Sequence, residues 1–190
     1  MKIQKIKYRL TSESPLLMHN GLLADPLSKW SKELKKITSK RQKVDSDIVE
    51  MARLEFYGSL YVDEKENPII PSELIEASII NGAKAEKLGK LFKSSVFVNG
   101  HSLMEYDGPK SPDKLWEDEN FRLVVGVKIG QARIMRTRPK FNKWKCITEV
   151  SFIDESVQEE MIDRAIIKAG ILVGIGDWRP KFGRFSVEKL

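Results

Sequence analysis

Apolar and charged residues alternate at the start of the chain, where Ile6, Tyr8 and Leu10 are separated by basic residues. A period of two is typical of a strand with one buried face. The same alternation over residues 144–153 predicts a second strand, with one face formed by Trp144, Cys146, Thr148, Val150 and Phe152. Residues 122–138 read as one strand, or as two strands broken at Gly126 or Gly130, and 179–187 as a loop with a final strand.

Helical spacing replaces this alternation in four segments. Over residues 28–43, Trp30, Leu34 and Ile37 form one apolar stripe, and the rest of the surface is almost all lysine. Further helices are predicted over 45–61, over 73–87 with Ser72 as N-cap, and over 156–170 with a capping box from Ser156 to Glu159. Turn signals predict a short hairpin at 97–100, a helical turn at 113–116 and a turn at 139–142.

The order of these elements is β-α-β-β-α-β once a helical segment after the first strand is set aside. That order predicts an α+β fold of the ferredoxin-like (RRM-like) type. The lysine-rich helical insertion covers 16–62, and the whole chain, 1–190, is expected to form one domain.

Composition narrows the classes of function. Apolar residues make up 41% of the 190 positions, which is enough for a core, and 33 Lys and Arg against 27 Asp and Glu leave a net charge of +6. A basic excess favours partners that carry phosphate. A single cysteine and two histidines argue against a disulfide, a cysteine zinc cluster or a multi-histidine metal site, so we expect no cofactor. No apolar run approaches the roughly 20 residues of a membrane span, and the N-terminus does not resemble a signal peptide, so a cytoplasmic protein is expected.

Three basic segments are candidates for binding. The first is the helix over 29–43, which contains one acid, Glu33. Its candidate residues are Lys32, Lys35, Lys36, Lys40 and Arg41. Such a helix either binds phosphates with strong salt dependence or is simply a solvated surface.

The second segment, 128–145, contains no acidic residue. Its candidates are Arg133, Arg136, Arg138, Lys140 and Trp144. Arg136 and Arg138 alternate on a strand and therefore share one face. Basic side chains beside aromatic rings suit a single-stranded nucleic acid, because bases stack on rings while arginines bind phosphates. The alternative is a hairpin whose aromatic residues pack inward.

The third segment is the glycine-rich run 170–185, GILVGIGDWRPKFGRF. Its candidates are Trp178, Arg179, Lys181 and Arg184. The glycines permit tight turns and close approach of the backbone to a ligand. The run is neither a Walker motif nor a dinucleotide fingerprint, because its spacing fits neither. We expect the three basic segments to converge on one concave surface.

Three features together resemble the RAMP superfamily of CRISPR-associated proteins, especially the Cas7-type backbone subunits. These are the ferredoxin-like order, the segment IIPSELIEA at 69–77, and the tail GIGDWRPKFGRF. Ser72 stands where that family usually has glycine, and Glu76 where arginine is common. The segments LLMHNGLLADPL and GDWRPKFGRF also resemble phage or prophage proteins. The resemblance implies a protein that binds RNA or single-stranded DNA and polymerises along the strand, as a homo-oligomer or within a ribonucleoprotein.

Two residues are weak candidates for catalysis. Some proteins of the superfamily cut RNA with an aspartate after the first strand, where Asp25 lies, and others use a histidine as general base, as His19 could. A non-catalytic binding protein is the main expectation. A small RAMP-type endoribonuclease and a phage-encoded protein that mimics a CRISPR subunit are the alternatives. The choice between RNA and DNA stays open.

Overall fold

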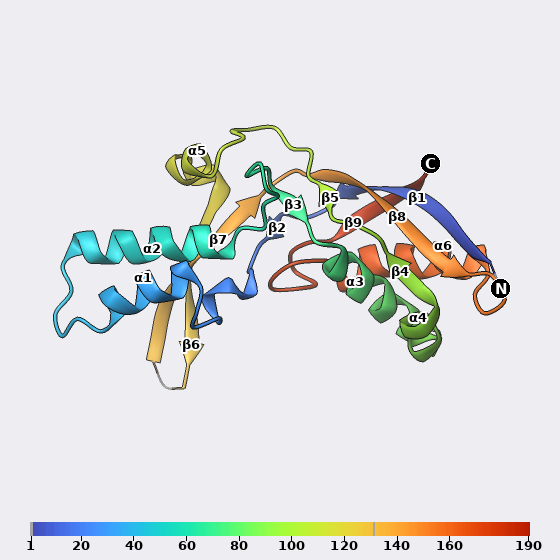
Figure 1. The fold of residues 1–190 in the computed structure, drawn as a ribbon, viewed down its shortest axis with the longest axis horizontal. Coiled ribbons are helices and arrows are strands. Elements are labelled where there is room, and N and C mark those ends of the chain that lie inside the picture. Colours follow the sequence, from blue (N-terminus) through green and yellow to red (C-terminus); the bar gives the residue numbers. More distant parts are fainter. Residues whose placement is uncertain (1, 131) are drawn as a thin grey trace.

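The computed structural model describes residues 2–130 and 132–190, with side chains except at positions 129, 132 and 133. It is an α+β protein with antiparallel sheets, and the described part contains six α-helices (Figure 1). The molecule is elongated, with the larger sheet and its helices at one end and a second sheet with helices α1 (Lys29–Thr38) and α2 (Asp45–Ser59) at the other (Figure 1).

The larger sheet forms around the first strand of the chain. Its members are β1 (Ile3–Ser12), β4 (Val96–Val98), β8 (Lys145–Ile153) and β9 (Phe185–Lys189), in the order β4-β8-β1-β9. All neighbouring strands are antiparallel, and Leu10 lies opposite Cys146 in the register of β1 and β8. The predicted face of β8 is confirmed, because its alternate residues from Cys146 to Phe152 are buried.

Two helices complete the core at this end of the molecule. These are α3 (Ser72–Lys84) and α6 (Glu159–Lys168), and α6 continues into a π-helical turn, η3 (Ala169–Val173). Ile75 and Ile79 of α3 and Ile162 of α6 are fully buried in the hydrophobic cluster that includes β1 and β8. A side chain at Gly82 would meet the backbone of Ala165 and Ala169, so glycine lets the two helices approach closely.

Both helices were predicted, but their expected caps are wrong. Ser72 is the first helical residue of α3, and Pro71 occupies the cap position. The backbone N–H of Ser72 is instead bound by Nδ1 of His101 at 3.2 Å. Helix α6 begins after Gln158, which displaces its cap by two residues from Ser156.

The second end of the molecule contains β2 (Leu16–Leu17), β6 (Arg122–Ile129) and β7 (Ala132–Phe141), in the order β2-β7-β6. Strands β6 and β7 form the expected pair with a break at Gly130, whose φ of 61° suits a hairpin turn. This pair is a separate hairpin and takes no part in the larger sheet. The turn predicted at 139–142 is wrong, because β7 runs on to Phe141 and pairs there with Leu16.

Two predicted helices cover this smaller sheet. They are α1 (Lys29–Thr38) and α2 (Asp45–Ser59), and a single 3-10 turn, η1 (Gly21–Leu23), precedes them. Ring stacking joins the helices, since the centroids of Trp30 and Tyr57 lie 5.5 Å apart. Helix α2 also contacts β7 through polar groups of the candidate site.

The remaining elements of the described residues are short. They are β3 (Ile69–Ile70), α4 (Gly89–Ser95), β5 (Ser102–Leu103), α5 (Pro112–Glu117) and η2 (Glu119–Phe121). The helical turn predicted at 113–116 is confirmed as part of α5. The hairpin predicted at 97–100 is wrong, because β4 pairs with β8 and β5 pairs with β3. Within the described residues, no helix has the length and apolar character needed to traverse a bilayer.

Candidate functional site

The glycine-rich run forms a loop that joins the two ends of the molecule. The position of this loop depends on Gly176, which has a φ of 80°. Gly176 lies so close to the carbonyl oxygen of Leu17 that a Cβ at this position would overlap it. The next residue, Asp177, donates its backbone N–H to that oxygen at 2.9 Å. At the start of the loop, the buried hydroxyl of Ser78 on α3 donates to the carbonyl of Gly174 at 2.8 Å. Both contacts place Asp177 against β2.

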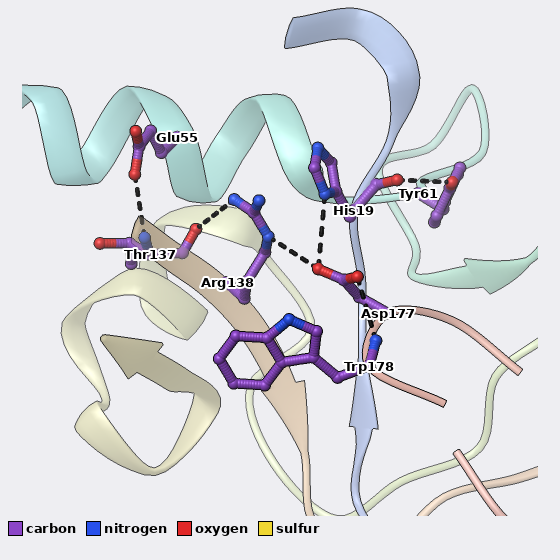
Figure 2. Close-up of polar contacts among 7 residues, drawn as sticks. All are labelled: His19, Glu55, Tyr61, Thr137, Arg138, Asp177 and Trp178. Atoms are coloured by element: carbon purple, nitrogen blue, oxygen red, sulfur yellow. Dashed lines mark hydrogen bonds and ion pairs between the residues drawn. The ribbon is translucent and has the colours of Figure 1, made fainter. Parts of the chain in front are cut away.

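Asp177 connects two residues that come from distant parts of the chain (Figure 2). Its Oδ2 accepts a hydrogen bond from Nε of Arg138 at 3.1 Å and lies 3.4 Å from Nδ1 of His19. These contacts with His19 and Arg138 lower the pKa of Asp177 to about 2, against the opposing effect of partial burial. The carboxylate is therefore ionised at any physiological pH. It contacts Nδ1 of His19 and not the second imidazole nitrogen, Nε2.

The backbone also holds His19 in place. The hydroxyl of Tyr61 donates to the carbonyl oxygen of His19 at 2.9 Å (Figure 2). The next residue, Asn20, donates from its side chain to the carbonyl of Leu60 at 3.1 Å. His19 is thereby held through its imidazole by Asp177 and through its backbone by Tyr61, just after α2, while its side chain stays 43% exposed.

A second ion pair lies beside the first. Glu55 on α2 is 3% exposed and forms a short ion pair with Nη1 of Arg136. Its other oxygen accepts the backbone N–H of Thr137 at 2.9 Å. Arg136 and Arg138 therefore lie on the same face of β7, as their alternation predicted, and each guanidinium is fixed by a carboxylate from another element.

Trp178 follows Asp177 and is one of the few large exposed rings. Its indole is 39% exposed, and its φ of 54° places a bulky residue in the left-handed region. Such strain concentrates at functional sites. The ring centroid lies 6.1 Å from that of Phe182, and Nζ of Lys181 is 5.9 Å from the Phe182 centroid. The exposed guanidinium of Arg179 makes no ion pair with any described residue.

Three adjoining cavities connect these residues. The first, of about 350 Å³, lies between the β6–β7 hairpin and α1 and is lined by Arg136, Arg138 and His19. The second, about 230 Å³, shares His19 with the first and also contacts Asp177. The third, about 430 Å³, shares Asp177 with the second and extends to Trp178 and Arg179. Neighbouring cavities share lining residues and therefore adjoin one another, and we call the three together the junction groove.

Trp144 is not part of this groove, and the expectation that it stacks on bases is wrong. Its side chain is 1% exposed and packs edge-to-face against Phe185. Its Nε1–H donates to the carbonyl of Ser14 at 3.3 Å, so the polar edge of the ring is also satisfied inside the protein. The alternation that predicted the strand places Trp144 on the buried face.

Other expected residues lie outside the groove. Arg184 lines a separate hollow with Glu13 and Ile171, so the glycine-rich run divides its basic residues between two surfaces. Lys140 is half-buried on β7. The side chain of Arg133 lies outside the described part of the structure.

The basic helix is exposed but partly neutralised. Lys36 forms an ion pair with Glu33 at 2.6 Å, and Lys40 forms one with Asp47 at 2.6 Å. Lys32, Lys35 and Arg41 are exposed on and just after α1. Only the apolar stripe of α1 reaches the junction groove, through Leu34.

Among the two weak catalytic candidates, His19 lies in the groove and Asp25 is a turn residue. A side-chain oxygen of Asp25 accepts the backbone N–H of Leu27 at 2.9 Å, which is the turn-forming role of such aspartates. Sequence reasoning missed Asp177 and Glu55. The signal for Asp177 is its position as the one acid in the glycine-rich run, and the signal for Glu55 is an acid between the apolar residues Leu54 and Phe56.

Metal chemistry has no obvious location in this groove. Across residues 2–130 and 132–190, no group of three or more histidine, cysteine or acidic side chains is placed to hold a metal ion. Comparison of the chain with known protein families and with curated proteins found no match.

Proposed function

We propose that the protein binds single-stranded nucleic acid, RNA or DNA, in the junction groove and does not cut it. The observation that carries this proposal is Trp178, an exposed ring held in a strained backbone conformation beside Arg179, at one end of a groove whose other end holds Arg136 and Arg138. Proteins that bind single strands combine rings that stack on bases with a positively charged groove that follows the phosphates.

The charge of the groove supports moderate, salt-sensitive binding. Glu55 and Asp177 balance Arg136 and Arg138, so the arginines act mainly as oriented donors. The unpaired charge comes from Arg179, Lys181 and the exposed part of α1, at the margins of the groove. Each phosphate that these residues neutralise would release counterions and make binding weaker at higher salt.

The fold supports a more specific proposal about the family to which the protein is related. Strand order β4-β8-β1-β9, with α3 and α6 in the two crossovers, is consistent with a ferredoxin-like core that carries the 16–62 insertion. On that basis we propose a RAMP-like, Cas7-like protein, with single-stranded RNA or DNA and further copies of the chain as its partners. The copies would assemble along the strand.

The test is fluorescence anisotropy of a labelled 40-nucleotide single strand, long enough for several binding sites. We expect Trp178→Ala to weaken binding by about 5- to 150-fold, since one base-aromatic stack contributes about 1–3 kcal/mol. Phe97→Ala is the matched control, because Phe97 is 38% exposed on β4 of the larger sheet. Equal affinity of the wild type and Trp178→Ala would reject the site. Absence of binding by the wild type would reject the function.

His19 favours an endoribonuclease as the second candidate. A carboxylate beside Nδ1 orients an imidazole so that Nε2 can accept a proton, which is the arrangement of a general base. In RNA, Nε2 would take the proton of a ribose 2′-hydroxyl, whose oxygen would attack the adjacent phosphorus. The 5′-oxygen of the next nucleotide would be displaced and would take its proton from water. Labelled RNA incubated with the protein, with and without magnesium, separates the candidates. Cleavage that is lost in His19→Ala and absent with DNA would favour the enzyme.

A further inference from the structure

The first cavity of the junction groove has a different character from the other two. Its walls are aliphatic, with Leu23 from η1, Leu34 from α1 and Val127 from the β6–β7 hairpin. Its polar lining residues are Arg136, Arg138, His19 and the buried Glu55. A cavity with apolar walls and a few fixed polar groups is the usual form of a small-ligand site. The volume of about 350 Å³ lies at the lower end of the range for such sites.

The cavity offers N–H donors from Arg136 and Arg138 that no acceptor in the described part of the chain uses. Arg138 donates from Nε to Asp177 and from Nη1 to the carbonyl of Thr137, and Arg136 donates from Nη1 to Glu55. Among the described residues, Nη2 of Arg138 and both Nε and Nη2 of Arg136 have no such partner. Two arginines therefore retain N–H groups next to the cavity.

Both oxygens of each carboxylate that holds these arginines accept a hydrogen bond. Glu55 accepts from Arg136 and from the backbone N–H of Thr137. Asp177 accepts from Arg138 and, through its other oxygen, from the backbone N–H of Trp178 at 3.0 Å. Donors that are fixed in advance by such partners lose little freedom when a ligand binds. An anionic ligand with several acceptor oxygens complements this end of the cavity.

We infer that this cavity is a subsite for one nucleotide of a bound strand. The phosphate accepts hydrogen bonds from Arg136 and Arg138, and the attached base lies between Leu34 on α1 and Val127 on the hairpin. This assignment rests on the proposed binding of single-stranded nucleic acid. It adds to that proposal the place at which one base of the strand is separated from its neighbours. The balanced charges of the site mean that recognition of this nucleotide depends on shape and oriented donors more than on net charge.

The hairpin offers a matched pair of variants that tests the subsite. Val127→Trp places an indole in the cavity, whereas Val124→Trp adds the same side chain on the opposite face of β6, because the two positions differ by an odd number of residues. Val124 is 51% exposed, so its variant alters no packed group. Thermal unfolding of both variants first establishes that they are folded.

The probe is a 12-nucleotide oligothymidylate with one central 2-aminopurine, excited beyond the absorption of tryptophan. The wild type and Val124→Trp should raise the 2-aminopurine emission at least twofold as the base leaves its neighbours. Val127→Trp should bind about tenfold more weakly and raise it far less. An equal rise and equal affinity in all three proteins would overturn the subsite while leaving the proposed function standing.

Failure of the proposed function gives a different pattern, in which the wild type binds no oligonucleotide. Adenosine monophosphate, adenosine and inorganic phosphate are then titrated separately, with the amide resonances of Thr137 and Asp177 as reporters. If the monophosphate shifts these amide resonances in the wild type but not in Val127→Trp, the cavity binds a nucleotide even without a strand. Absence of such shifts, or equal shifts with inorganic phosphate alone, would overturn it.

Discussion

Nε of Arg138 donates a hydrogen bond to Oδ2 of Asp177 across 3.1 Å, and this contact joins β7 to the glycine-rich loop. The same oxygen lies 3.4 Å from Nδ1 of His19, so one carboxylate holds three segments of the chain together. The contact explains why the junction groove forms where the two ends of the molecule meet. It also connects the stability of the protein with the geometry of its candidate site.

The first prediction concerns stability in acid. The pKa of Asp177 falls from its ordinary 3.8 to about 2 in the folded protein, chiefly through His19 and then through Arg138. A depressed carboxyl pKa adds stability that is complete above about pH 4 and is lost as the pH falls through 2. The contribution is about 2 kcal/mol. We expect urea unfolding of Asp177→Asn to show lower stability at pH 7 and a weaker loss between pH 4 and pH 2.

The control for that experiment is Asp107→Asn, which removes the charge of an exposed aspartate. This variant should keep the acid dependence of the wild type. If Asp177→Asn and Asp107→Asn have the same free energy of unfolding at every pH, the ion pairs of Asp177 contribute no stability and its assigned role is incorrect.

The second prediction separates two tryptophans that look alike in the sequence. Trp144 is buried in the core, and its replacement by alanine should cost about 3–5 kcal/mol of folding free energy. Trp178 is exposed, and Trp178→Ala should change that free energy by no more than about 0.5 kcal/mol. Denaturant titrations measure both values. A large loss of stability in Trp178→Ala would mean that its ring packs in the fold and is not free to stack on a base.

The third prediction tests how the glycine-rich loop packs against β2. Alanine at position 176 would need a left-handed backbone and would overlap the carbonyl of Leu17. We expect Gly176→Ala to lose about 1–3 kcal/mol of stability and to displace Asp177. Oligonucleotide affinity should therefore fall with it. Gly100→Ala is the control, since Gly100 has a similar φ of 78°, has open space around it and lies outside the groove between β4 and β5. Unaltered binding by both variants would count against the groove.

The fourth prediction concerns the single cysteine. Burial raises the pKa of the Cys146 thiol to about 12, so almost no thiolate exists near neutral pH. A thiol reagent should label the native protein only at the rate of unfolding and should label it at once in strong denaturant. Rapid stoichiometric labelling under native conditions would contradict the position of Cys146 on the inner face of β8.

Local periodicity was sufficient to find most of the secondary structure. The buried face of β8 and the helices α2, α3 and α6 follow from apolar spacing, because each of these elements contributes buried residues to the core. Helix α1 follows from the same spacing, although none of its residues is buried and its stripe packs on α2 through Trp30. Pairing partners are different, since they depend on contacts between distant segments. Strand β4 therefore pairs with β8 and not with the residues that follow Gly100, and the β6–β7 hairpin leaves the larger sheet.

The candidate site was only partly predictable for the same reason. His19, Arg138 and Trp178 were each chosen for their own chemistry, and the structure brings them to one groove. Asp177 and Glu55 were missed because their importance comes from the arginines that they hold, 39 and 81 residues away in sequence. Trp144 was misread because an aromatic residue beside lysines has the same sequence pattern whether its ring faces the core or the solvent.

The most direct test of nucleic-acid binding in the junction groove is the salt dependence of single-strand affinity for the wild type and Arg179→Ala. Anisotropy titrations with a labelled oligonucleotide, repeated at several salt concentrations, yield the slope of log K against log salt. The wild type should bind measurably, and the slope should be reduced by about 1 in Arg179→Ala, as expected when one phosphate contact is lost. Lys93→Ala, an exposed charge on α4, should leave the slope unchanged. An affinity that does not change with salt concentration, or identical slopes for the wild type and Arg179→Ala, would contradict binding of the strand in the junction groove.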